Sequence, residues 1–223
     1  MKAANCSASS YAGYGLLMMV VLLFASAPAS ASSLAVTPAG TIVGGYVPYA
    51  LTTAWDFSLT QSYQVTALDL YNNGTPFTNS NQVGLWAAST QTGYAIGTLL
   101  ATVTFGPSAQ GTTNGLFHSL SIAPLVIGPG AYEVGVLLQP SSDPYIYSQS
   151  SYTLLPGLVY QNVGHVNTSG VFTYPGGSNA STGYFAANFE AQPVSATPEP
   201  ASLLLLGSGF VGAMGAIRRK ANR

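Results

Sequence analysis

The central part of the chain alternates apolar and polar residues over short stretches that turn-forming residues separate. In the run AYEVGVLL, Tyr132, Val134, Val136 and Leu138 fall on one face of an extended strand, and Glu133, Gly135 and Leu137 fall on the other. Segments such as NNGTPFTNSN, IGPG and PGGSNASTG have turn or loop composition. No stretch of this region shows a helical period with caps. The pattern predicts strands at Ile42–Val47, Ala54–Leu59, Gln64–Tyr71, Gln82–Ala87, Thr98–Phe105, Phe117–Ile122, Tyr132–Leu138, Leu154–Gln161, Gly170–Tyr174 and Tyr184–Glu190.

Many short strands at this spacing predict an all-β fold, an antiparallel β-sandwich that is jelly-roll-like. The sandwich domain is expected to span residues 41–191. Residues 32–40 and 192–200 are small, polar and proline-bearing on either side of it. We interpret these two segments as linkers.

The N-terminal segment has the organisation of a signal peptide. Lys2 precedes an apolar run, Gly15–Ala25, which is about as long as a signal-peptide core. Small residues at Ala29 and Ala31 follow in an A-x-A arrangement. We therefore predict that residues 1–31 form a signal helix, which signal peptidase removes by cleaving after Ala31.

The C-terminal segment is apolar from Ala201 to Ile217, close to the minimum length for crossing a bilayer. Arg218, Arg219 and Lys220 follow at once, and a basic cluster of this kind stays on the cytoplasmic side of a membrane. Residues 201–223 are therefore expected to form a transmembrane helix with a basic tail that retains the chain in the membrane.

Pro198, Glu199 and Pro200 directly precede this apolar run. A Pro-Glu-Pro triplet, an apolar helix and a basic cluster at the C-terminus together resemble a PEP-CTERM sorting signal. The resemblance implies that an exosortase processes the chain near Pro198–Pro200. It also implies an inner-membrane intermediate, followed by transfer to the cell surface or the extracellular matrix. The expected processing partners are thus exosortase and signal peptidase.

The distribution of charge excludes one class of function. All five basic residues lie in the two terminal segments, so residues 32–197 contain no Lys or Arg. The same span keeps five acids: Asp56, Asp69, Glu133, Asp143 and Glu190. A domain without cations cannot neutralise phosphates, which argues against nucleic-acid binding. Its stability must come from apolar burial and hydrogen bonds rather than from ion pairs with Lys or Arg.

The domain also resembles an uncharacterised β-sandwich module that recurs in PEP-CTERM proteins. Matching segments include AWDFSLT, QVTALDLYNNG, NQVGLWAAS, GTLLATVTF and GYFAANFEA. The chain departs from the module at Asp69, where Gly is usual, and at Asn72–Asn73, where an acidic pair is common. The resemblance implies no enzymatic activity.

The residues themselves give little support for catalysis or for a metal cofactor. His118 is expected in a strand and His165 in a loop, and no nucleophile elbow of the G-x-S-x-G type is present. The spacing of the histidines matches no zinc site. Calcium remains an option, because Asp56, Asp69, Asn72, Asn73, Asp143 and Glu190 offer oxygen ligands near strand ends. The alternative is that the acids are solvated surface groups.

Tyrosines suggest an alternative function, carbohydrate binding through an aromatic face. Tyr145, Tyr147 and Tyr152 lie in one segment that we expect to be an exposed loop, and we predict them as the candidate glycan contacts. Trp55 and Trp86 are expected to be core residues instead. The main hypothesis is an exported cell-envelope or matrix protein without catalysis, whose partners include extracellular polysaccharide. The carbohydrate-binding module, calcium-assisted or not, is the alternative.

Overall fold

The computed structural model describes residues 31–88, 97–107, 111–140, 143–167, 169–175, 178–179, 183–194, 207, 209–210 and 217–218. The chain divides into two units, Met1–Ala31 and Ser32–Arg223. The strands that follow all belong to the second unit.

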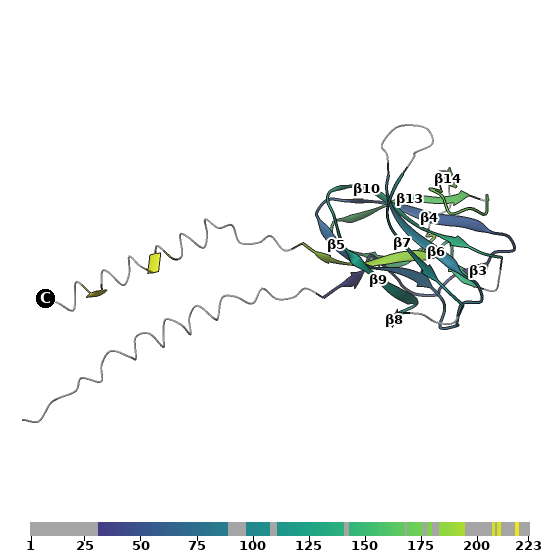
Figure 1. The fold of residues 1–223 in the computed structure, drawn as a ribbon, viewed down its shortest axis with the longest axis horizontal. Coiled ribbons are helices and arrows are strands. Elements are labelled where there is room, and N and C mark those ends of the chain that lie inside the picture. The colour runs from purple at the N-terminus through teal and green to yellow at the C-terminus, as the bar shows by residue number, and fades with distance from the viewer. Residues whose placement is uncertain are drawn as a thin grey trace, which may run out of the picture. The chain divides into compact units, whose positions relative to one another are not determined.

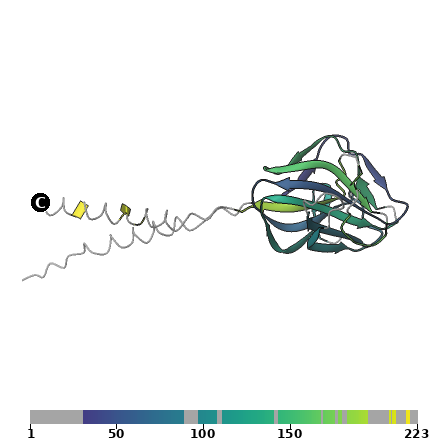
Figure 2. The ribbon, with the colours of Figure 1, turned by 90° about the horizontal axis from the view of Figure 1, so that it is seen from above.

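Two antiparallel sheets form the body of this unit (Figures 1 and 2). The five-stranded sheet has the order β1-β15-β5-β9-β8, with bounds Ser33–Leu34, Ala187–Pro193, Tyr63–Tyr71, Phe117–Ile127 and Thr112–Asn114. The six-stranded sheet has the order β14-β13-β4-β10-β6-β7, with bounds Ser178–Asn179, Leu158–Asn167, Leu51–Leu59, Gly130–Leu138, Asn81–Ala87 and Thr98–Phe105. Two small ribbons pair β11 with β3 and β12 with β2, with bounds Pro144–Ile146, Gly44–Tyr46, Tyr152–Leu154 and Val36–Pro38.

The strand pairs are nested along the chain. The β6–β7 pair is innermost, and β5–β9, β4–β10, β3–β11 and β2–β12 enclose it in turn, all antiparallel. A long two-stranded ribbon that rolls up on itself gives this order of pairs, which is how a jelly roll is built. The all-β, antiparallel prediction is confirmed, and the nesting is the feature that a jelly-roll-like sandwich requires.

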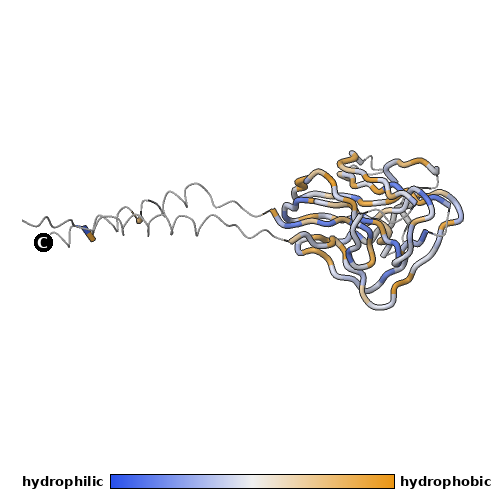
Figure 3. Tube along the Cα trace, turned by 60° about the horizontal axis from the view of Figure 1, so that its bottom comes forward, coloured by the Kyte–Doolittle hydropathy of each residue, from blue (hydrophilic) through white to orange (hydrophobic). Residues whose placement is uncertain are grey.

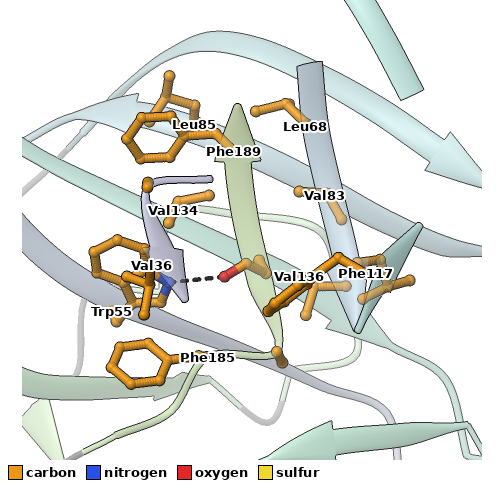
Figure 4. Packing of buried hydrophobic residues seen from close by; sticks show 14 of the residues in the cluster. Val36, Trp55, Leu68, Val83, Leu85, Phe117, Val134, Val136, Phe185 and Phe189 are labelled. Atoms are coloured by element: carbon orange, nitrogen blue, oxygen red, sulfur yellow. Dashed lines mark hydrogen bonds between the residues drawn. The ribbon is translucent and has the colours of Figure 1, made fainter. Parts of the chain in front are cut away.

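One hydrophobic core lies between the two sheets. Trp55 and Phe57 on β4 and Phe189 on β15 meet across the core, with ring centroids 5.0–6.4 Å apart. Figure 4 shows Trp55, Phe185 and Phe189 together with the valines of β10. The Trp55 indole donates a 2.8 Å hydrogen bond to the Ala187 carbonyl, so its one polar atom is satisfied although the ring is fully buried. The prediction that Trp55 is a core residue is confirmed. Trp86 is also buried, but on the outer face of the six-stranded sheet against Phe172 rather than in this core.

The alternation along β10 follows the predicted pattern. Val134, Val136 and Leu138 enter the core, whereas Glu133 and Gly135 lie on the other face of the sheet. Hydrophobic and polar residues are interspersed along the whole sandwich in this way (Figure 3).

The segment 32–40, which we expected to be a linker, instead contributes two strands to the sandwich. Strand β1 pairs with β15, and β2 pairs with β12. Ala35 and Val36 are fully buried, and the Asn188 amide group bonds both the backbone N–H and the carbonyl of Val36. The C-terminal boundary also moves, because β15 runs on through Gln192 to Pro193. The domain thus enters and leaves at one sheet edge, where Ser33 pairs with Ala191.

Two predicted strands differ from the structure for local reasons. The predicted strand Leu154–Gln161 is divided into β12 and β13, because Pro156 lacks an N–H and Gly157 has a φ of +74°. The predicted strand Gly170–Tyr174 is not a strand. This segment instead packs over the outer face of the six-stranded sheet, with the Phe172 ring 5.2 Å from that of Trp86.

His165 lies in β13 opposite Ala54, so the prediction that it is a loop residue is wrong. His118 is a buried strand residue on β9, as expected. The two histidines belong to different sheets.

In the part of the chain that the structure describes, no helix is long and apolar enough to span a bilayer. The predicted signal helix lies outside the described residues. Of the predicted C-terminal helix and tail, residues 207, 209–210 and 217–218 are described, and they are helical.

Substituting Gly135 with Ala tests the close packing in the middle of the six-stranded sheet. A Cβ at this position would lie 2.4 Å from the Ala54 Cβ and 2.8 Å from the Thr53 carbonyl oxygen. Because backbone atoms cannot yield, we expect Gly135→Ala to lower the unfolding free energy by about 1–3 kcal/mol in denaturant titrations. Gly128→Ala is the matched control, because its Cβ would meet no atom closer than 3.9 Å. Equal stability of the two variants would contradict this packing.

Candidate functional site

Four tyrosines that are exposed or partly exposed cluster on the β3–β11 ribbon and beside it. We call Tyr49, Tyr145, Tyr147 and Tyr184 the tyrosine patch. The Tyr145 ring lies 5.7 Å from the Tyr147 ring and 6.2 Å from the Tyr184 ring, the latter nearly stacked at 23°. Tyr49 is 53% exposed and lies close enough to Tyr145 to affect its pKa. The patch therefore offers aromatic faces of a kind that sugar rings can stack on.

Glycines allow these rings to gather. Gly45 pairs with Tyr145 across the ribbon, and a Cβ there would lie 2.9 Å from the Tyr147 ring. Gly183 has a φ of +77° and packs directly on the backbone of Gln149, whose N–H donates to the Gly183 carbonyl. This contact brings Tyr184, the next residue, alongside the ribbon.

The patch is neutral. Burial raises the pKa of Tyr145 above its usual value, and the neighbouring Tyr184, Tyr147 and Tyr49 raise it further. The Tyr145 phenol therefore stays protonated at physiological pH and can donate a hydrogen bond.

Of the three tyrosines predicted as glycan contacts, the structure brings Tyr145 and Tyr147 together and places Tyr152 elsewhere. The Tyr152 ring packs edge-on against Phe185 and Tyr160, at 5.0 and 5.7 Å, as a neighbour of the core. Tyr49 and Tyr184 were not predicted. They come from distant parts of the chain, so only the fold reveals that they join the cluster.

The acids of the domain are not solvated surface groups, which was the alternative to a calcium site. Asp69, Glu133 and Asp143 are buried, and Asp56 and Glu190 are half-buried. The undescribed segments within residues 32–194 contain no charged residue. The surface of this domain is therefore almost without formal charge.

Asp143 is held by neutral donors. Its carboxylate accepts bonds from the Thr78 N–H and hydroxyl, from the Asn79 N–H at 3.1 Å and from the Asn81 amide at 2.8 Å. Burial alone would raise the pKa of Asp143, but these hydrogen bonds outweigh burial and lower it below the usual 3.8. Asp143 thus joins the loop before β6 to the segment before β11.

Asp56 and Glu133 are register partners on β4 and β10, on the outer face of the six-stranded sheet. Like charges opposite one another are unfavourable. Tyr174 covers this pair and bonds Glu133, and burial followed by the charge of Glu133 raises the Tyr174 pKa. The segment that contains Phe172 and Tyr174 therefore serves as a cover for these two carboxyl groups.

Asp69 and Glu190 lie on neighbouring strands of the five-stranded sheet. Glu190 accepts bonds from the Ser119 hydroxyl at 3.0 Å and from the Asn114 amide at 2.8 Å. Burial raises the pKa of Asp69 to about 8, and the charge of Glu190 adds to this, while Ser119 partly offsets it. The other predicted calcium ligands are elsewhere: Asn72 closes its own turn by accepting from the Gly74 N–H, and Asn73 occupies that turn with a φ of +50°.

Among the residues that the structure describes, no group of three or more His, Cys, Asp and Glu side chains is arranged to hold a metal ion. Any cation site in this part of the chain would therefore use at most two of these side chains, together with hydroxyl, amide or carbonyl oxygens.

Comparison with known protein families identifies a PEP-CTERM protein-sorting motif at residues 196–220. The chain is therefore a PEP-CTERM domain-containing protein, as its C-terminal sequence indicated. This signal implies processing by an exosortase and export to the cell surface or the extracellular space. Pro198, Glu199, Pro200, Arg219 and Lys220 lie outside the described residues, and Arg218 is helical and exposed. No curated protein and no solved structure matched the chain.

Replacing Asp143 with Asn tests the hydrogen-bonded carboxylate. The Asn amide would point a donor at other donors, so we expect a loss of about 3 kcal/mol in unfolding free energy at neutral pH. Because the pKa of Asp143 is lowered in the folded state, its stabilisation is present above pH 3.8 and disappears as pH falls through the lowered pKa. The difference between wild type and Asp143→Asn should shrink accordingly in acid, as followed by denaturant titrations at several pH values. Thr78→Val, which removes one donor, should cost about 1 kcal/mol. A difference that stays constant into strong acid would contradict the assignment.

Proposed function

We propose that this protein is a non-catalytic structural or interaction component of the cell envelope or extracellular matrix. The sorting motif at residues 196–220 is the single observation that carries the proposal. Signal peptidase removes residues 1–31, and the C-terminal helix with Arg218, Arg219 and Lys220 holds the chain in the inner membrane. Exosortase then acts near Pro198–Pro200 and releases the sandwich.

The surface of the sandwich supports this assignment. It carries no Lys or Arg, and its acids are buried or half-buried. A matrix of anionic polysaccharide would bind positive patches non-specifically and would repel a strongly negative surface. A domain with almost no exposed charge avoids both effects, so it can pack among such chains.

The tyrosine patch favours carbohydrate binding as a second candidate function. Its rings are partly exposed, neutral and mutually supported. Neutral sugar rings present apolar C–H faces and hydroxyl groups, which suit aromatic stacking and hydrogen bonds to phenols. The extracellular polysaccharide of the producing cell is the expected ligand.

Replacing Pro198, Glu199 and Pro200 with alanines tests the sorting step. We expect the full-length variant to remain in the inner-membrane fraction, because exosortase no longer recognises it and the basic tail retains it. Cell fractionation and immunoblotting measure the distribution. Tyr46→Ala, a change in the sandwich, should leave processing intact. Release of the alanine variant at the normal rate would contradict the assignment.

Replacing tyrosines of the patch tests the second function. We expect Tyr49→Ala and Tyr147→Ala each to weaken binding of extracellular polysaccharide by about tenfold, because each removes a stacking face. The matched control is Tyr46→Ala. Tyr46 is 62% exposed on the same ribbon, but it neighbours Gly45 in sequence and therefore faces the opposite side. Affinity electrophoresis in gels that contain the polysaccharide would show the difference. Equal retardation of all three variants and wild type would exclude the patch.

A further inference from the structure

The Asp69 carboxylate is the buried group whose neutralisation the contacts described above explain least. Asp69 lies on β5, the middle strand of the five-stranded sheet, between Asn188 on β15 and Ser119 on β9. It is 0% exposed, and neither of its carboxylate oxygens has a hydrogen bond of good geometry, although the Ser119 hydroxyl lies close enough to lower its pKa. A buried carboxylate without a donor costs several kcal/mol unless a proton or a cation neutralises it.

The donors of the neighbouring side chains bond elsewhere in the structure. Ser119 lies beside Asp69, but its single hydroxyl proton is donated to Glu190. The Asn188 amide nitrogen donates one of its two protons to the Val36 carbonyl, and its second proton makes no bond to the Asp69 carboxylate. His118, next to Ser119 on β9, faces the opposite side of the sheet, where its ring lies 5.7 Å from that of Phe77.

A second carboxylate and two further oxygen-bearing side chains lie near the Asp69 carboxylate. Glu190 on β15 approaches Asp69 closely enough to raise its pKa. Asn114 bonds Glu190 from β8, although β9 and β5 lie between β8 and β15 in the sheet. The β8–β9 hairpin must therefore fold over this face of the sheet. Leu34 of β1 also reaches it, because a Cβ on Gly115 would lie 4.0 Å from the Leu34 side chain. The two carboxyl groups are thus enclosed by the sheet and this hairpin.

The chain itself offers no cation to this enclosure, because residues 32–197 contain no Lys or Arg. We propose that Asp69 and Glu190, assisted by the oxygens of Ser119 and Asn114, bind a calcium ion on the outer face of the five-stranded sheet. The donors are all oxygens, which calcium prefers and which zinc or copper sites seldom use alone. Calcium also accepts irregular coordination and completes its shell with backbone carbonyls or water, whereas magnesium demands a near-octahedral arrangement.

Calcium binding would tie β5 and β15 to the β8–β9 hairpin. Strand β15 is the last strand before the sorting motif, so the ion would reinforce the sheet edge from which the chain leaves the domain. The calcium site is separate from the tyrosine patch. The result of the calcium experiment therefore does not decide the tests of either proposed function.

Calcium titration of the full-length chain, purified in mild detergent and freed of metal with a chelator, tests the site. We expect saturable binding of one ion in calorimetry, with a dissociation constant in the micromolar to millimolar range. The midpoint of thermal unfolding should rise by several degrees in millimolar calcium, since only the folded chain holds the ligands together. Terbium emission sensitised by nearby tyrosines gives an independent readout.

Asp69→Asn provides the decisive variant, because it keeps the shape of the side chain and removes its charge. We expect this variant to fold, to be at least as stable as wild type in chelator, and to lose both the thermal shift and the terbium signal. Asp56→Asn makes the same change of charge on the other sheet and should retain both responses. No saturable calcium response in wild type would overturn the proposal. A response that persists in Asp69→Asn, or that Asp56→Asn loses equally, would also overturn it.

Discussion

The absence of Lys and Arg from the sandwich is the constraint on which the rest of the structure depends. Five carboxyl groups fold into a domain that has no cation to pair with them. Each must therefore be satisfied by neutral hydrogen-bond donors, by a proton or by an ion from outside. Asp143 has four neutral donors, Glu190 has two, and Glu133 is bonded by Tyr174. Asp69 is the buried acid for which we propose an ion, because the hydroxyl of its neighbour Ser119 donates to Glu190.

This constraint also shapes the outside of the molecule. Because the acids are drawn inward and the bases are confined to the chain ends, the domain presents hydroxyls, amides and aromatic rings to its surroundings. Such a surface suits sugar polymers better than nucleic acids or charged proteins. The sorting motif implies export to the cell surface or the extracellular space. The sorting motif and the surface chemistry of the sandwich belong to different parts of the chain, and both support the proposed function.

Local pattern was sufficient to predict most of the large strands. Thr98–Phe105 was predicted to the residue, and the alternation of AYEVGVLL gave the orientation of β10 correctly. The failures involve contacts between residues far apart in sequence. Residues 33–38 have the composition of a linker, and their role as strands depends on β12, β15 and the Asn188 side chain. By contrast, the break between β12 and β13 could have been predicted from the sequence, because Pro156 and Gly157 both interrupt strands.

In the candidate sites too, residues close in sequence could be predicted, whereas contacts between distant residues could not. Tyr145 and Tyr147 are near neighbours in sequence and could be recognised, whereas Tyr49 and Tyr184 reach the patch only through the fold. The sequence offered six oxygen-bearing residues as calcium ligands without a way to pair them. Sheet register brings Asp69 and Glu190 together, because β5 and β15 are adjacent and the two side chains share a face.

The most direct test of the central claim is to titrate the side-chain carboxyl carbons of the chain by NMR in the presence of chelator. If the domain satisfies its acids without cations, Asp143 titrates below its usual pKa of 3.8, and Asp69 remains protonated up to a pKa of about 8. Five carboxyl groups that titrate together near their ordinary values would show that they are solvated, and would contradict the account.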